Sequence, residues 1–161
     1  MLRVSSVIAA ALLAVPLAPA IAQEATGPSQ DAAWHNRQQI ALAERASQGW
    51  YALPGGVLWR RIAGDGTGPS PTVQDTVTLH YAGTLIDGTE FDSSYTRGQP
   101  ATFPLGSLIR AWQLAVPQMG IGDTIEIALP ADLGYGPIGR GPIPGGATLL
   151  FKIELLAIAG R

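Results

Sequence analysis

The chain has 161 residues, of which 47% are apolar and 14% are charged, enough for one globular domain with extensions. Its formal net charge of −2 argues against a nucleic-acid or anionic-membrane partner, because no basic patch is available to neutralise phosphates. The absence of cysteine excludes disulfides, thiolate metal sites and a lipid anchor attached through cysteine.

Residues 1–22 have the pattern of a secretory signal peptide. One Arg near the start precedes an apolar run over 7–17, and residues 20–22 read Ala-Ile-Ala, the small-x-small pattern of a cleavage site. We therefore expect a periplasmic or secreted protein with no membrane anchor after cleavage. An uncleaved anchor is the alternative, but Pro16 and Pro19 interrupt the apolar run, which is short for a bilayer span.

Residues 23–52 are expected to form an N-terminal extension that contains one short helix. Asp31 is a candidate N-cap, and Gly49 is placed to end the helix. The expected apolar stripe of this helix consists of Ile40, Leu42, Ala43 and Ala46. Because the helix is short, we expect it to lie on its own domain rather than to form a dimer, and we expect a monomer.

Residues 53–161 are interpreted as one domain that begins with a strand over 57–62. The next stretch, 63–72, contains several Gly and Pro residues and predicts a loop. Its glycine spacing does not indicate a nucleotide site, because neither the strand–turn–helix pattern nor the Lys and Ser or Thr of a phosphate loop accompanies it.

The stretch 77–94 predicts a hairpin. Apolar and polar residues alternate over 77–81, as in a half-buried strand, and Asp87-Gly88 is a strong turn signal before a second short strand at 90–92. This hairpin would bring Tyr81 close to the aromatic and acidic side chains of the second strand.

The remaining elements are a short strand at 101–104, a helix, and two longer strands at 124–129 and 148–156. Ser107 is a candidate N-cap for the helix, and Pro117 is expected to stop it. The expected buried face of the helix consists of Leu108, Ile109, Trp112, Ala115 and Val116. A long flap rich in Gly and Pro separates the last two strands, and these elements together predict an α+β domain.

Conventional catalytic and metal-binding patterns are missing from this sequence. A nucleophilic triad needs a Ser or Cys beside an oriented His, but Cys is absent and neither His35 nor His80 has a recognisable triad setting. Two His without paired carboxylate spacing also make a metal site improbable.

Residues 80–94, HYAGTLIDGTEFDSS, closely resemble the central motif of the FKBP-type peptidyl-prolyl cis-trans isomerases. The similarity continues in separate blocks, in matching order, from about Gly56 to about Ala157. The resemblance implies the same architecture, an antiparallel sheet of about five strands wrapped around one short helix. It also implies an apolar pocket with a few polar tips.

The resemblance places the pocket residues at matching positions of this sequence. The expected catalytic residues are Tyr81, Phe91, Asp92, Trp112, Tyr135 and Phe151. The expected substrate-binding residues are Arg97, Phe103, Leu108, Ile109 and Ile143. Among them, Asp92 would be held by the Tyr81 hydroxyl and steadied by Arg97, and Trp112 would form the floor. Core packing is the alternative interpretation for each aromatic taken singly.

The activity that the resemblance implies is acceleration of X–Pro isomerisation in the folding of exported proteins, without cofactor or metal. Its expected partners are proline-containing unfolded or partly folded polypeptides, and macrolides such as tacrolimus are candidate ligands. Two alternatives use the same surface without much catalysis: a chaperone-like module that holds unfolded chains, and a docking subunit of an envelope complex.

Three positions depart from the family pattern. Ala101 stands where an aromatic is frequent, which should widen one wall of the pocket. The loop over 105–108 is shorter, and the flap over 136–146 is rebuilt with Arg140 between two prolines. These changes predict an altered preference for substrates and macrolides.

Overall fold

The computed structural model describes residues 30–160, so the signal-peptide prediction for residues 1–22 lies outside the described residues. Within these residues the α-helices are α1 (Ala32–Ser47) and α2 (Arg110–Ala115). The strands are β1 (Tyr51–Leu53), β2 (Val57–Ala63), β3 (Thr76–Leu85), β4 (Glu90–Ser93), β5 (Ala101–Pro104), β6 (Thr124–Leu129), β7 (Gly139–Arg140), β8 (Ile143–Pro144) and β9 (Leu149–Ile158).

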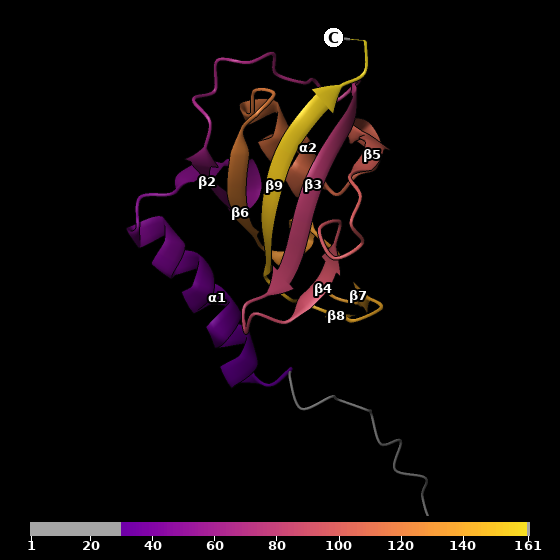
Figure 1. Cartoon of the computed structure of the whole chain (residues 1–161). Coiled ribbons are helices and arrows are strands. Elements are labelled where there is room, and N and C mark those ends of the chain that lie inside the picture. Colours follow the sequence, from indigo (N-terminus) through magenta and orange to yellow (C-terminus); the bar gives the residue numbers. More distant parts are fainter. Residues whose placement is uncertain (1–29, 161) are drawn as a thin grey trace, which may run out of the picture.

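An antiparallel sheet of seven strands forms the body of the domain (Figure 1). Its order is β1-β2-β6-β9-β3-β4, and β5 pairs with β3 beside β4. The α+β prediction is confirmed, but the expected number of about five strands was too low. The sequence did not predict β1, a three-residue strand that pairs Tyr51 with Trp59 of β2.

Strand alternation builds the core. In β9 the residues at 149, 151, 153 and 155 are buried, whereas Lys152 is exposed, as period-two patterning requires. β3 shows the same alternation, and its long pairing with β9 joins Val77 to Ile158 and Leu85 to Leu149. This inner face packs against α2 and the flap, whereas the opposite face carries the polar side chains.

The helix α2 fills the concave side of the sheet, with Ala111, Trp112 and Ala115 buried. It is shorter than expected because Leu108 and Ile109 are extended and lie before it. The expected N-cap role of Ser107 is wrong, since its hydroxyl donates to Pro104 O within a 3₁₀ turn.

The end of α2 agrees with the expected stop, because the α-helix ends at Ala115, two residues before Pro117. Pro117 lies inside a 3₁₀ turn, Val116–Gln118, that continues from α2. Proline at an early position of such a turn costs little, because the missing N–H would have no partner there. The chain therefore makes one further 3₁₀ turn after α2 and becomes extended at Met119.

The helix α1 lies against its own domain, as expected, but with a different face (Figure 1). Asp31 caps it by accepting a hydrogen bond from Trp34 N at 2.7 Å. The buried residues are Trp34, Gln38 and Ala41, whereas Ile40 is 54% exposed and the expected stripe is wrong. A buried polar residue, Gln38, takes the place of an aliphatic one, so apolarity alone points to the wrong face.

The glycine-rich loop between β2 and β3 is anchored by one buried carboxylate. Asp123, 2% exposed, accepts hydrogen bonds from Arg61 Nε at 3.0 Å, Gly66 N at 3.0 Å and Gly120 N at 2.8 Å. A side chain at Gly64 would collide with this carboxylate. The glycines therefore serve close packing, consistent with the absence of a nucleotide-binding pattern.

The flap contains more regular structure than its composition predicts. It begins with a 3₁₀ turn, Ala131–Leu133, and continues into a small hairpin of β7 and β8. At Gly145 a Cβ would collide with the carbonyl oxygen of Pro137, so only glycine permits the two arms to approach this closely.

Candidate active site

A cavity of about 420 Å³ opens between the inner face of the sheet, α2 and the flap. Its lining is mostly aromatic and aliphatic with few polar groups, the composition of a small-ligand pocket. The lining residues are Tyr81, Phe91, Asp92, Phe103, Leu108, Ile109, Trp112, Tyr135, Arg140 and Phe151. The neighbouring strands β3, β4, β5 and β9 contribute to it together with α2 and the flap, so the site exists only in the folded domain.

Aromatic contacts hold Trp112 in place. Its ring centroid lies 5.3 Å from that of Tyr81 and 5.3 Å from that of Phe151, with interplanar angles of 80° and 88°. Phe91 makes a similar edge-to-face contact with Phe151 at 5.5 Å. Edge-to-face pairs at these distances are favourable, and together they fix the orientation of the indole. Trp112 is 4% exposed and presents an apolar surface to the cavity.

Gly83 makes room for this aromatic cluster. A Cβ on Gly83 would lie 2.6 Å from Phe91 and 2.7 Å from Phe151, well inside van der Waals contact. A glycine within a strand often marks such a close approach. Gly83 stands in the middle of the motif shared with the family, and this signal could have predicted the close packing of the two phenylalanines.

A polar triad forms one wall of the cavity. The Tyr81 hydroxyl of β3 donates to Asp92 Oδ2 of β4 at 2.5 Å, and Arg97 Nη2 donates to the Tyr81 oxygen at 2.9 Å. Arg97 Nη1 also forms an ion pair with Asp92 Oδ1. The antiparallel register that pairs Gly83 with Asp92 brings these side chains together. Both oxygens of the carboxylate therefore have donors.

The triad keeps Asp92 ionised. Burial alone would raise the pKa of the Asp92 carboxyl, but the hydrogen bonds from Tyr81 and Arg97 and the positive charge of Arg97 outweigh it and hold the pKa below its ordinary value. Burial, with the neighbouring Asp92 carboxylate, raises the pKa of Tyr81. At neutral pH the wall therefore carries a carboxylate, a neutral phenol and a guanidinium.

The structure brings together most of the expected site residues. All of them line the cavity except Arg97, which contacts Asp92 and Tyr81 from beside it, and Ile143, which is buried in the core at β8. Ala101 lies partly buried in β5, packed against the core, and does not line the cavity. Arg140 lines the cavity and was not expected to do so, since the sequence identified it only as a change in the flap.

No group of His, Asp and Glu suited to a metal ion occurs among residues 30–160. Within the same residues no helix is long and apolar enough to cross a membrane. His80 has a structural setting on the outer face of the sheet, where its Nδ1 lies 2.9 Å from Ser94 Oγ and its ring stacks on Tyr95.

Comparison with known families identifies the domain. The model of the FKBP-type peptidyl-prolyl cis-trans isomerase family matches residues 68–156, more than half of the chain. The chain belongs to this family. The match spans β3 to β9 and includes every residue that lines the cavity.

Individual relatives of the family are also similar to this chain. The chain is 52% identical over 93 residues to the FKBP-type isomerase FkpA of Aeromonas hydrophila, covering 58% of this chain and 35% of that protein. It is 46% identical over 118 residues to the outer membrane protein MIP of Legionella longbeachae, covering 72% and 50% respectively. The chain thus spans between about a third and a half of the length of these curated relatives.

Solved structures agree with the fold. A peptidyl-prolyl isomerase from Pseudomonas syringae pv. tomato superposes with a TM-score of 0.70 at 34% identity, covering 76% of this FKBP chain and 91% of that one. FkpA from Escherichia coli superposes with a TM-score of 0.65 at 32% identity, covering 78% and 64%.

Proposed function

We propose that this FKBP domain accelerates cis–trans isomerisation of X–Pro bonds in polypeptides. The observation that carries the proposal is the cavity itself, in which Trp112 forms an apolar floor beside a carboxylate held ionised by Tyr81 and Arg97. Its volume of about 420 Å³ suits a prolyl ring with parts of its neighbours.

The reaction needs no proton transfer. Rotation about an X–Pro bond is slow because amide resonance is lost in the twisted state. Water stabilises the planar amide, which is more polar than the twisted one, so transfer of the bond into a dry cavity lowers the barrier. In this proposal the prolyl ring lies over Trp112, and the fixed aromatic walls favour the twisted shape.

The polar groups of the cavity would orient the substrate. Tyr135 stands at the start of the flap and lines the cavity, where its hydroxyl can donate to a carbonyl next to the proline. The Asp92 carboxylate, partly exposed, is the fixed negative charge near the rotating bond. Arg97 and the Tyr81 hydroxyl keep this carboxylate in place.

A second candidate function is chaperone-like binding of unfolded chains. The observation that favours it is Ile138, an apolar side chain that lies on the flap two residues before Arg140 and is 92% exposed. Suppression of aggregation that survives substitution of the cavity residues but fails in Ile138→Ser would support this function over catalysis.

The cellular setting belongs to the same proposal. The N-terminal pattern of residues 1–22 and the similarity to a protein named as an outer membrane protein support export to the bacterial envelope. Another relative is named an FK506-binding protein, which supports tacrolimus as a test ligand. Clients would then be exported chains that fold slowly at proline.

The decisive experiment measures X–Pro exchange in a protease-free peptide assay. Wild-type protein should accelerate exchange, and the double variant Asp92→Ala, Tyr135→Phe should lose most of the rate, because it removes the Asp92 carboxylate and the Tyr135 hydroxyl from the cavity. The matched control is Tyr95→Phe, which removes a phenol hydroxyl from the outer face. Wild-type activity no greater than that of the double variant would contradict the proposal.

Tacrolimus titration provides an independent check of the cavity. Fluorescence should change in the wild type together with loss of isomerase activity, and Trp112→Phe should remove the fluorescence change, although three other Trp remain. A fluorescence change that persists in Trp112→Phe would place the ligand elsewhere.

A further inference from the structure

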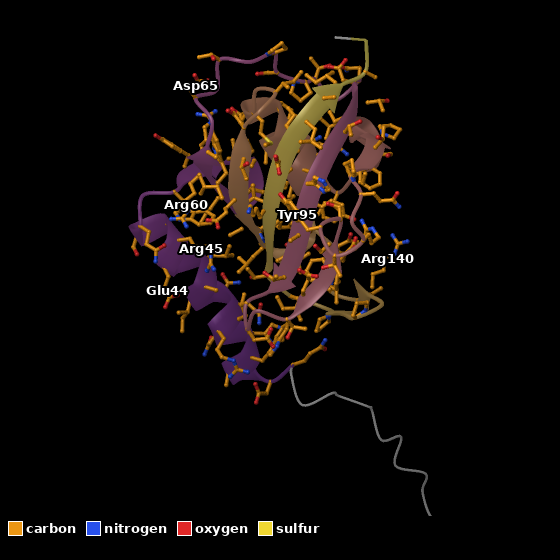
Figure 2. The ribbon with its side chains drawn as sticks, viewed as in Figure 1. Glu44, Arg45, Arg60, Asp65, Tyr95 and Arg140 are labelled. Atoms are coloured by element: carbon orange, nitrogen blue, oxygen red, sulfur yellow. The ribbon has the colours of Figure 1, made fainter. Side chains whose placement is uncertain are left out.

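The flap places one positive charge at the mouth of the cavity. Arg140 lies in β7 and lines the cavity together with Trp112 and Asp92. It lies on the side of the molecule away from Glu44 and Arg45 of α1 (Figure 2). Its guanidinium makes no hydrogen bond or ion pair with any residue between 30 and 160.

The backbone fixes the place from which Arg140 extends. Arg140 pairs with Ile143 across the hairpin, and Gly139 N donates to Tyr135 O at 3.2 Å. Gly146 N donates to Gly136 O at 2.9 Å and closes the base of the flap. The backbone of Arg140 is therefore held in place by the hydrogen bonds of the hairpin, although its side chain is exposed and can move.

The other charges at the cavity are already paired. Asp92 and Arg140 are the only lining residues among 30–160 with a full charge at neutral pH, and the Asp92 carboxylate is occupied by Arg97 and the Tyr81 hydroxyl. Arg140 thus faces an incoming chain as an unpaired cation. A guanidinium binds a carboxylate well because its N–H groups match the two oxygens.

We propose that Arg140 is a specificity-determining residue that selects proline segments with a Glu or Asp directly before or after the proline. The proposal rests on the isomerase function argued above. The floor formed by Trp112 would bind the prolyl ring, and Arg140 would bind the neighbouring carboxylate at the rim. The domain would then prefer acidic X–Pro segments over neutral or basic ones.

The test compares peptides that differ in one side chain. Protease-free exchange is measured with Ala-Glu-Pro-Phe, Ala-Gln-Pro-Phe and Ala-Lys-Pro-Phe, and with the same three residues placed after the proline. Wild-type kcat/KM should be about two- to fivefold higher for Glu than for Gln at one of the two positions, the range for an exposed ion pair. This ratio should approach one as salt is raised towards about 1 M, because salt screens exposed charges.

Variants assign the preference to Arg140. Arg140→Gln should bring the Glu-to-Gln ratio to about one, and Arg140→Glu should favour Lys over Glu. Arg37→Gln, with the same loss of charge on the exposed side of α1, should keep the wild-type ratio. Circular dichroism and the thermal midpoint verify that each variant is folded.

The outcomes separate the two proposals. An active wild type with equal rates for Glu, Gln and Lys peptides at both positions would overturn the role of Arg140 and leave the isomerase function in place. A preference that persists in Arg140→Gln would also overturn it. A wild type that accelerates none of the peptides would overturn the isomerase function, and the role of Arg140 with it.

Discussion

At the scale of single residues, the wall made by Tyr81, Asp92 and Arg97 determines the charge state of the cavity. Each side chain of the triad contacts the other two, and the phenol both donates and accepts. A carboxylate that receives hydrogen bonds from two donors is stabilised in its charged form. Removal of one donor should therefore change the titration of Asp92 as well as the stability of the fold.

Tyr81→Phe should raise the pKa of Asp92 towards the ordinary value for Asp. The lost hydrogen bond should lower the free energy of unfolding by about 1 kcal/mol. Side-chain NMR titration of Asp92 and urea denaturation measure the two effects. Tyr95→Phe is the matched control, because Tyr95 donates to Glu154 at 3.0 Å on the outer face, and it should leave the Asp92 titration unchanged. An unchanged Asp92 pKa in Tyr81→Phe would contradict the assigned triad.

The rate of isomerisation should be constant from about pH 5 to about pH 9. The lowered pKa of Asp92 and the raised pKa of Tyr81 leave both groups in one protonation state throughout this range. The folded pKa of Asp92 lies below its unfolded value, so its contribution to stability is present above about pH 3.9 and is lost as the pH falls through the folded pKa. A bell-shaped rate profile centred near neutrality would indicate acid–base chemistry instead.

At the scale of elements, the sequence predicts those whose pattern is local and periodic. The strands β6 and β9 were predicted closely and β3 over its first half, since alternation and flanking turns are visible in the chain. The buried face of α1 was not predicted, because burial of Gln38 depends on its hydrogen bond with Thr148, which is 110 residues away in the chain. The hairpin within the flap was missed for the same reason, since its pairing depends on close contacts between glycine-rich arms.

Gln38→Ala should destabilise the domain by about 1 to 3 kcal/mol, because Thr148 N loses its acceptor while it stays buried. Urea denaturation measures the loss. Gln39→Ala is the matched control on the exposed side of the same helix and should stay within about 0.5 kcal/mol of the wild type. Equal effects of both substitutions would show that the helix does not dock through Gln38.

Gly145→Ala should open the flap hairpin, because the added methyl group meets the carbonyl of Pro137. The expected result is a loss of about tenfold or more in kcat/KM while the sheet remains folded, since small displacements of positioning groups are costly. Gly141→Ala is the control within the same hairpin: its Cβ would meet nothing within 4 Å, although its positive φ of 54° adds some strain. Full activity in Gly145→Ala would show that the hairpin geometry is not needed.

At the scale of the whole molecule, the resemblance to the family predicted which residues form the pocket, whereas hydrophobic periodicity alone could not. Periodicity alone places Trp112 and Phe151 in a core, and only the resemblance assigned them to a pocket. The proposed role of Arg140 at the rim could not be inferred from the sequence, because the flap differs from the family pattern and its fold depends on contacts between its two arms.

The protein should sediment as a monomer at micromolar concentration. The buried face of α1 packs on its own sheet, with Gln38 bonded to Thr148 and Gln30 Nε2 donating to Gly145 O at 3.1 Å, so this face is not free to pair with a second copy. Analytical ultracentrifugation measures the mass. A dimer that persists on dilution would show that another surface, such as the exposed Tyr51 at the sheet edge, forms an interface.

The position of β9 in the sheet has a consequence for the newly made chain. Among the strands of this sheet β9 is the last in the chain and leaves the ribosome after the others, yet it lies in the middle of the sheet, between β6 and β3. Until it emerges, both neighbours present unpaired edges that can bind other unfolded chains. The central pairing of β3 with β9 also joins distant parts of the chain, which makes folding slow. A protein proposed to help others fold would thus itself be incompletely folded during its synthesis, because β3 and β6 lack their shared partner strand until β9 has been made.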